Sequence, residues 1–287
     1  MKRNRLTFFA VLSLLGASAY LYTRSRGPFF PRMGAADIPP RKLENIIKRT
    51  DAALEKNPSD LAALVDRGVA HFHMGPEFYD ESHDELSEAW RNGAFDKRVF
   101  YYLGVLYENL SIFEEADKQY RRFLNHEPED REIRMRLARL EFRLGNWEEA
   151  IEQYHKLVQK DPKDVTSLIN LGLAYQSRYK TESSKKGKDR KSDDELKGLL
   201  YQAVANLEGA AALNPELSKG IYLALADAYA SSGAWDKAAP AAETELSKHP
   251  AENEKEVYSL LAQAYKKLNR KEDLQRVLDL KKKLKIK

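Results

Sequence analysis

The chain has no cysteine among its 287 residues. This absence excludes disulfide bonds, thiolate metal sites, a cysteine nucleophile and a bacterial lipoprotein anchor. An excess of charge of one sign is also missing, because 48 Lys and Arg stand against 44 Asp and Glu. The formal net charge of +4 therefore gives no overall electrostatic reason to expect nucleic-acid binding.

Sequence motifs of catalysis are missing too. There is no glycine-rich phosphate loop, no nucleophile elbow and no zinc-protease histidine pair. His71 and His73 are two residues apart, which on a helix directs them to different faces. A metal site would need them together with His83, Asp80 and Asp84, and we favour ordinary polar helix and loop positions instead. We expect no enzyme activity, no cofactor and no metal.

One long uncharged stretch is present, from Leu6 to Tyr22, with basic residues on both sides. Its 17 residues would span about 25 Å as a helix, slightly less than the ~30 Å hydrocarbon core of a bilayer. We interpret residues 1–26 as a signal anchor or transmembrane helix. The alternatives are a cleaved signal, with small residues at 17–19 as the cleavage site, and a buried helix of a soluble protein.

This interpretation sets the expected location. Basic residues ahead of the apolar stretch predict a cytoplasmic N-terminus and a single membrane pass, with the rest of the chain on the far side. In a bacterium that side is the periplasmic face of the inner membrane, and signal cleavage would instead give a secreted or periplasmic protein. Residues 27–40, with four prolines and two glycines, predict an extended linker. We assign Phe29 and Phe30 to this linker, the alternative being contact with the membrane interface.

A repeat of 34 residues dominates the rest of the sequence. Three residues recur one period later: Ala116, Tyr120 and Pro128 as Ala150, Tyr154 and Pro162. A period in this range indicates stacked helical pairs. Successive pair-ending prolines are 70, 34, 53 and 35 residues apart: Pro58, Pro128, Pro162, Pro215 and Pro250. The third gap exceeds the period by 19 residues, so one pair carries an insertion between its two helices.

Two glycines stand inside the predicted helices. Gly104 and Gly172 each follow a leucine and precede a tyrosine on the same helix face. A glycine inside a helix costs about 1 kcal/mol relative to alanine. We therefore expect a close approach of the neighbouring helix, which Ala116 and Ala203 on the second helices would also permit.

Taken together, these positions resemble the tetratricopeptide repeat, whose pattern is a large apolar residue, Leu-Gly, Tyr, Ala, an aromatic residue and Pro. The matching positions are: Gly104, Tyr107, Ala116, Tyr120, Pro128, Ala150, Tyr154, Pro162, Gly172, Tyr175, Ala203, Pro215, Tyr229, Ala238 and Pro250. Ala138 and Glu141 depart from the pattern in one unit, and His71 in another. The resemblance implies an all-α fold, a right-handed superhelical solenoid of helical pairs. Its expected parts are a cap helix at 41–57 and repeats at 61–96, 97–130, 131–164, 165–217, 219–252 and 255–287.

The resemblance also implies a binding surface, since proteins of this family bind partners on a concave face lined by the first helix of each pair. The corresponding positions here are: Val65, Val69, Phe72, Tyr101, Val105, Met135, Arg139, Phe142, Ile169, Asn170 and Leu173. The set is apolar, which favours an amphipathic helix or an extended apolar segment of a partner protein as the ligand. The Lys and Asn carboxylate clamp of the chaperone-tail-binding branch is absent where Tyr101 and Val105 stand. Alternatively, the protein's own cap or a second copy fills this surface.

The insertion, at 178–196, carries seven Lys and Arg and two acidic residues between 178 and 191. Its composition predicts a mobile loop, either simply solvated or in contact with anionic lipid or an acidic partner. The sequence as a whole predicts a membrane-tethered scaffold for protein–protein interaction. The alternatives are an exported helper subunit of a cell-envelope enzyme, and a binder of lipid surfaces or nucleic acid through the basic insertion.

Overall fold

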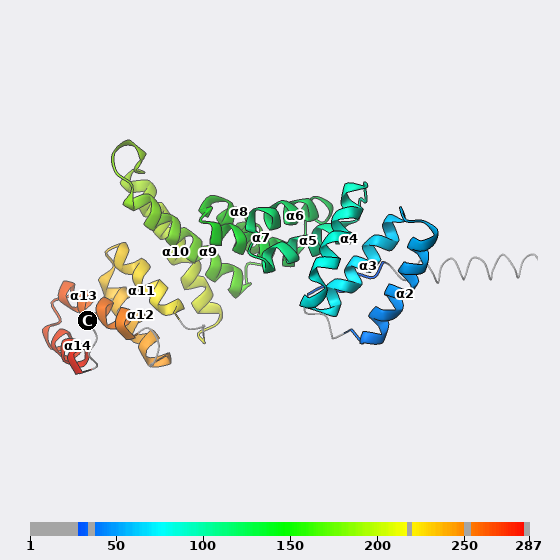
Figure 1. Cartoon of the computed structure of the whole chain (residues 1–287). Helices are drawn as coiled ribbons and strands as arrows, with labels where there is room; N and C mark the ends of the chain where they lie inside the picture. Colours follow the sequence, from blue (N-terminus) through cyan, green and yellow to red (C-terminus); the bar gives the residue numbers. More distant parts are fainter. Residues whose placement is uncertain (1–27, 34–37, 217–219, 250–253, 284–287) are drawn as a thin grey trace, which may run out of the picture. The chain divides into compact units, whose positions relative to one another are not determined.

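The computed structural model describes residues 28–33, 38–216, 220–249 and 254–283. These residues form α-helices joined by short turns, with no β-strand among them, so the predicted all-α repeat fold is confirmed. The chain divides into two compact units, the first ending at Pro128 and the second beginning at Glu129. Figure 1 shows antiparallel helices following one another along each unit.

The first unit contains five helices in its described part: α2 (Pro40–Lys56), α3 (Leu61–Met74), α4 (Tyr79–Arg91), α5 (Lys97–Asn109) and α6 (Phe113–His126). The second unit contains eight in its described part: α7 (Arg131–Leu144), α8 (Trp147–Lys160), α9 (Val165–Ser184), α10 (Asp193–Leu213), α11 (Ile221–Ser231), α12 (Trp235–Lys248), α13 (Glu254–Lys267) and α14 (Lys271–Lys283). In each unit, helices that are adjacent in sequence form antiparallel pairs.

An aspartate is the N-cap of the first helix in four of the helical pairs. The side chains accept a hydrogen bond from a backbone N–H of the first turn: Asp60 before α3, Asp96 before α5, Asp130 before α7 and Asp164 before α9. Such a cap is worth about 1 kcal/mol because it satisfies a backbone donor that the helix leaves unpaired. The caps are spaced by 36, 34 and 34 residues, so they follow the repeat period.

The mid-helix glycines lie where two helices of a pair approach closely. A Cβ placed on them would come within 2.5–2.8 Å of a side chain of the second helix: Gly68 with Leu86, Gly104 with Tyr120 and Gly172 with Leu207. No Cβ is tolerated at such a distance, so the lost helix propensity is offset by close packing. Small residues serve the same purpose on the second helices, where four alanines are fully buried: Ala116, Ala150, Ala203 and Ala238.

The prediction of a mobile loop across the insertion is wrong. α9 continues to Ser184 and α10 begins at Asp193, so most of the insertion lengthens two helices. Figure 1 shows their ends and the short connection projecting beyond the neighbouring helices. Leu196 is buried near the start of α10, and Trp147 of α8 donates a hydrogen bond to Thr181 at 3.0 Å. These contacts give the segment a packed face that its charge-rich composition conceals.

We expect the two parts of the insertion to respond differently to substitution. Replacing residues 185–190, which are exposed, by Gly and Ser should change the free energy of unfolding by less than about 0.5 kcal/mol. Leu196→Ala should cost about 2 kcal/mol or more, because it removes buried apolar volume. Urea denaturation followed by circular dichroism measures both. Equal effects of the two changes would contradict the packing of this extension.

Some predictions fall on other parts of the chain. The predicted anchor at residues 1–26 and the pair-ending Pro250 lie outside the described residues. Among the described helices, none has the length and apolar character needed to cross a bilayer.

Candidate protein-binding grooves

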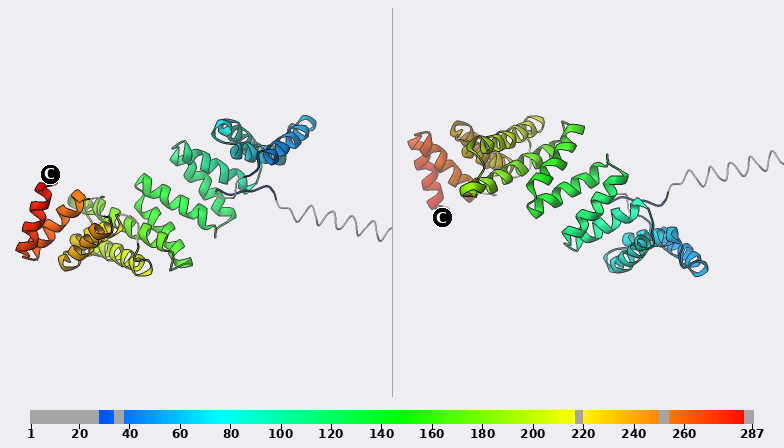
Figure 2. Two further views of the ribbon diagram at one scale, coloured as in Figure 1. Left: turned by 90° about the horizontal axis from the view of Figure 1, so that it is seen from below. Right: turned by 90° about the horizontal axis from the view of Figure 1, so that it is seen from above.

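Residues 28–33, which we call the N-terminal strap, lie against α3, α5 and α6 of the first unit (Figure 2, dark blue). Three side chains hold alternate backbone groups of the strap. Arg98 donates to the carbonyl of residue 29 at 2.9 Å, Tyr102 donates to the carbonyl of residue 31, and the hydroxyl of Tyr101 accepts from the N–H of Met33 at 2.7 Å. Alternation of this kind is how an extended peptide is bound.

The intervening strap side chains lie on an aromatic surface. The ring of Phe30 meets Tyr101 edge-on at 5.2 Å and lies 6.3 Å from the ring of Phe123. The guanidinium of Arg32 lies 4.6 Å from the centre of the Tyr101 ring and 5.3 Å from that of Phe123. Phe29 packs in a separate place, beside the apolar cluster of α2 and α3. The assignment of Phe29 and Phe30 to a plain linker is therefore wrong, because Phe30 fills an aromatic groove of the first unit and Phe29 packs against a different apolar cluster.

Arg98 is the charged centre of this site. Its side chain is 4% exposed, and it joins the N-cap Asp96 of α5, Asp66 of α3 and the strap carbonyl. The guanidinium lies 2.7 Å from a carboxylate oxygen of each aspartate. Burial alone would lower the pKa of Arg98, but the hydrogen bonds to Asp96 and Asp66 outweigh burial and hold the pKa above its ordinary value. Arg98 therefore remains a cation that fixes the strap backbone.

His73 supplies a neutral donor to the same segment. Burial lowers the pKa of His73, and the hydrogen bond to the Pro31 carbonyl opposes this only in part. The imidazole is therefore neutral at neutral pH. Because a carbonyl only accepts, Nε2 of His73 carries the proton and donates to Pro31 at 3.1 Å.

The groove positions predicted in the first unit lie in its interior. All five are less than 5% exposed: Val65, Val69, Phe72, Tyr101 and Val105. Tyr101 differs from the others because its ring and hydroxyl contact the strap. The remaining four pack in the helical core, since the first helices α3 and α5 are covered on more than one side. These positions present no open surface to a partner in this structure.

In the second unit, the predicted positions are more accessible. Met135 is buried, Arg139 is exposed and the other four are half-buried: Phe142, Ile169, Asn170 and Leu173. The amide of Asn170 donates to the sulfur of Met135 at 3.8 Å, so α7 and α9 are direct neighbours here. The predicted positions thus mark the beginning of an inner face in this unit.

The inner face continues into an open groove of about 480 Å³ lined by α9, α11 and α13. We call it the α9–α13 groove. Its lining residues all come from first helices of successive pairs or the turn before one: Gln176, Lys180, Gly220, Leu223, Ala224, Asp227, Ala230, Glu256, Ser259, Leu260 and Gln263. The side chain of Gln176 donates to Asp227 at 2.9 Å and to the carbonyl of residue 224 at 3.0 Å. This buried amide fixes α9 against α11 and so sets one wall of the groove.

Sequence reasoning missed the α11 and α13 part of this groove. The signal was available, because the prolines on either side of the insertion are 53 residues apart. The residue 53 positions after the predicted groove position Asn170 is Leu223, which lines the groove. The groove positions could have been continued past the insertion by that step.

Family comparisons match three parts of the chain. A model described as "TPR repeat" matches residues 138–177, and models described as "Tetratricopeptide repeat" match 98–130 and 221–254. The chain contains tetratricopeptide repeats. The resemblance read from Gly104, Tyr107, Ala116 and their equivalents is thereby confirmed, and proteins built from such repeats generally mediate protein–protein interaction. A comparison with curated protein sequences gives no significant match.

Solved structures share the tetratricopeptide fold at low sequence identity. The MamA protein is 22% identical with a TM-score of 0.52, over 65% of this chain and 92% of that one. YrrB, described as a TPR protein with an unusual peptide-binding site, is 14% identical with a TM-score of 0.58, over 77% and 99%. The structure of Naa15/Naa10 bound to HypK-THB matches at 20% identity and a TM-score of 0.54, over 85% of this chain and 35% of that one. At these identities the likeness shows the fold alone.

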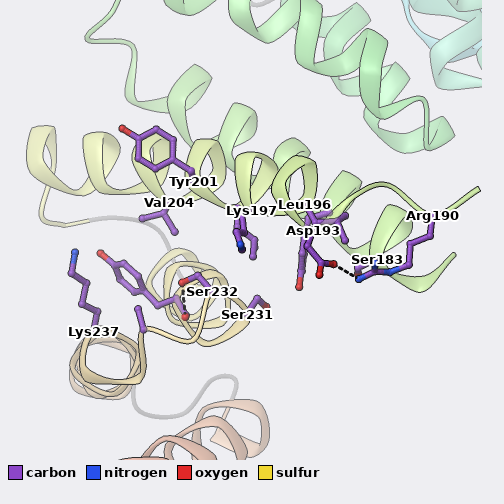
Figure 3. A pocket seen from close by; sticks show the side chains of 14 residues that line it. Ser183, Arg190, Asp193, Leu196, Lys197, Tyr201, Val204, Ser231, Ser232 and Lys237 are labelled. Atoms are coloured by element: carbon purple, nitrogen blue, oxygen red, sulfur yellow. Dashed lines mark hydrogen bonds and ion pairs between the residues drawn. The ribbon is translucent and has the colours of Figure 1, made fainter. Parts of the chain in front are cut away.

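A second hollow, of about 520 Å³, lies beside the lengthened helices of the tetratricopeptide pair that carries the insertion. Leu196, Tyr201 and Val204 of α10 line it together with Ser231 and Ser232 at the end of α11 (Figure 3). Its cations are paired with carboxylates: Arg190 lies 2.9 Å from Asp193, and the other pairs include Lys237 with Glu208. The hollow results from the insertion and lies apart from the predicted groove positions.

The histidines considered for a metal site lie apart within the repeats. His71 contacts Glu85 at 2.8 Å, His73 contacts the strap, and His83 contacts Tyr107 at 3.1 Å. Among the residues that the structure describes, no group of three or more His, Cys, Asp and Glu is placed to hold a metal ion.

Proposed function

We propose that this tetratricopeptide protein is a non-catalytic scaffold that binds a segment of a partner protein in the α9–α13 groove. The observation that carries the proposal is that the residues lining the groove come from several repeats. Side chains of three successive first helices line one open hollow, so a bound segment would contact several repeats at once. Family-wide use of such repeats in protein–protein interaction agrees with this role, as does the peptide-binding site described for YrrB.

The groove's chemistry favours an amphipathic or extended segment. Leu223, Ala224 and Leu260 supply apolar contact area, while Lys180 and Glu256 place charges of both signs at its edge. A hollow of about 480 Å³ lies within the range of roughly 300–1,000 Å³ typical of ligand sites, so it can take several side chains. A partner would bury apolar anchors on the floor and pair its polar groups at the rim.

We further propose that the apolar stretch at residues 6–22 tethers the scaffold to a membrane. This rests on the length of the stretch and its flanking basic residues. The alternative of a lipid or nucleic-acid binder acting through the insertion has less support, since several of its cations pair with carboxylates of the same segment. Lys185 with Glu182, at 2.8 Å, is one such pair.

Photo-cross-linking tests the groove. A benzophenone amino acid at Gln263, an exposed groove position, should form adducts with a partner protein in the full-length chain. Leu223→Glu should reduce those adducts at least about tenfold, since a central interface residue typically contributes about 2 kcal/mol or more. Carbonate extraction of the same samples reports whether the chain remains with the membrane.

Leu278→Glu is the matched control. Leu278 is 45% exposed on α14 and does not line the groove, so the same substitution should leave the adducts unchanged. Circular dichroism establishes that both variants are folded. Glu256→Arg, at another exposed groove position, provides a second groove variant if Leu223→Glu loses helicity. Identical adducts from both folded groove variants and the control would place the partner site elsewhere.

A further inference from the structure

The strap occupies its groove as a ligand does. It has no helix or strand of its own, and its ends at Pro28 and Met33 are exposed. Its backbone is bound by side chains of α3 and α5 instead of by a strand or helix partner. A segment held in this way is a candidate for exchange with another segment of the same chemistry.

The contacts define what the groove selects. The first selected position is aromatic, because Phe30 lies against three rings, those of Tyr101, Tyr102 and Phe123. Phe30 meets two of them edge-on, an arrangement worth about 0.5–1.5 kcal/mol per pair beyond area burial. This position therefore discriminates against aliphatic and polar residues.

The next two positions are selected by different means. Pro31 brings a carbonyl that accepts hydrogen bonds from both Tyr102 and His73, and its ring restricts the backbone to an extended form. Arg32 places its guanidinium over the Tyr101 and Phe123 rings in a cation–π contact. A lysine would fit this position less well than arginine, because its ammonium cannot stack on a ring as a planar guanidinium does. The selected sequence is thus aromatic, proline, arginine in an extended conformation.

We propose that the groove formed by α3, α5 and α6 is a recognition site for extended aromatic-Pro-Arg segments of partner proteins, and that the strap is its internal ligand. This site is separate from the α9–α13 groove and does not depend on the function proposed for it. A partner segment binds only when the strap leaves. Because the strap belongs to the same chain, its effective concentration is on the order of millimolar, so it lowers the apparent affinity for a competing segment.

The probe that tests this site is a fluorescein-labelled peptide with the sequence of residues 28–33. Its binding is measured by anisotropy to the full wild-type chain and to a full chain carrying Phe30→Ala and Arg32→Ala. We expect the peptide to bind the double variant at least about tenfold more tightly than the wild type, because the internal competitor is weakened. A control peptide with alanine in place of Phe30 and Arg32 should bind neither protein.

With a folded double variant, each other result overturns the proposal. If the double variant remains folded and binds no peptide, the strap is a fixed part of the first unit. Equal binding to the wild type and the variant, or equal binding of the two peptides, places the interaction outside this groove. A wild-type dimer that the double substitution abolishes would assign the groove to the strap of a second copy.

Should the double variant lose helicity, Arg32→Ala alone replaces it, since Arg32 lies at the surface of the aromatic groove and its removal leaves Phe30 in place. Cross-linking from Gln263 should be unaffected by these variants, so it reports separately on the α9–α13 groove.

Discussion

Gly104→Leu is expected to unfold the first unit under conditions in which the wild type is stable. A Cβ at this position would lie 2.5 Å from Cε1 and 2.6 Å from Cδ1 of Tyr120. Tyr120 cannot move aside, because its ring is fully buried and its hydroxyl donates to Glu108. Overpacking typically costs about 1–3 kcal/mol and occasionally more, and leucine adds four carbons here, so we expect about 3 kcal/mol or more.

The measurement is thermal unfolding followed by circular dichroism. For a unit of this size, a loss of about 3 kcal/mol corresponds to a melting temperature lower by about 10 °C or more. Gly198→Ala is the matched control, because a Cβ at Gly198 on α10 would meet nothing within 4 Å. It should stabilise the chain by up to about 1 kcal/mol through helix propensity alone. The two glycine substitutions thus have opposite expected signs, and an unchanged melting temperature for Gly104→Leu would contradict the close packing of α5 on α6.

The repeat architecture could be predicted because each pair faces the same packing problem. Glycine at the approach of the two helices, alanine on the second helix and proline after it recur at fixed spacing. The capping aspartates, such as Asp130 and Asp164, follow the same period and could have been added to the pattern. Periodic constraints of this kind are visible in a single sequence because every copy is an independent observation of them.

The strap could not be predicted from periodicity, because it occurs once. Its prolines indicated a linker, and that interpretation did not foresee its contacts with the first unit. The aromatic groove that binds it is assembled from α5 and α6, and Tyr101 and Phe123 are 22 residues apart in sequence. No local pattern connects these residues to Phe30.

The insertion was misjudged for a different reason. Its lysines suggested a solvated loop, although lysine is a good helix former and can cover apolar surface with its stem. The sequence did contain a signal for the start of α10, since Ser192 and Glu195 form a capping box. In that motif the serine side chain accepts from the N–H of Glu195, and the glutamate accepts from the N–H of Ser192 at 3.0 Å. Recognising it would have placed the helix boundary three residues before the buried Leu196.

Arg98→Met should destabilise the first unit by about 2–3 kcal/mol and release the strap. Removing one partner of a buried ion pair typically costs about 3–5 kcal/mol, because the other charge stays behind without compensation. The expected loss in free energy of unfolding is smaller here for two reasons. The carboxylates of Asp66 and Asp96 are 23% and 28% exposed, and Asp66 keeps its pair with Arg49 at 2.9 Å. Methionine retains most of the apolar stem, so the loss reports on the guanidinium and its hydrogen bonds.

Arg121→Met provides the comparison on the same unit. Arg121 is 45% exposed and pairs with Asp117 one helical turn away at 2.8 Å, an arrangement worth about 0.3–0.5 kcal/mol. Urea denaturation gives the free energy of unfolding of both variants, and limited proteolysis after Arg32 reports on strap release. Arg98→Lys should recover little of the stability, because an ammonium cannot bind Asp96, Asp66 and the strap carbonyl in the fixed plane of a guanidinium. Equal, small losses for Arg98→Met and Arg121→Met would mean that the buried guanidinium does not join the strap to α3 and α5.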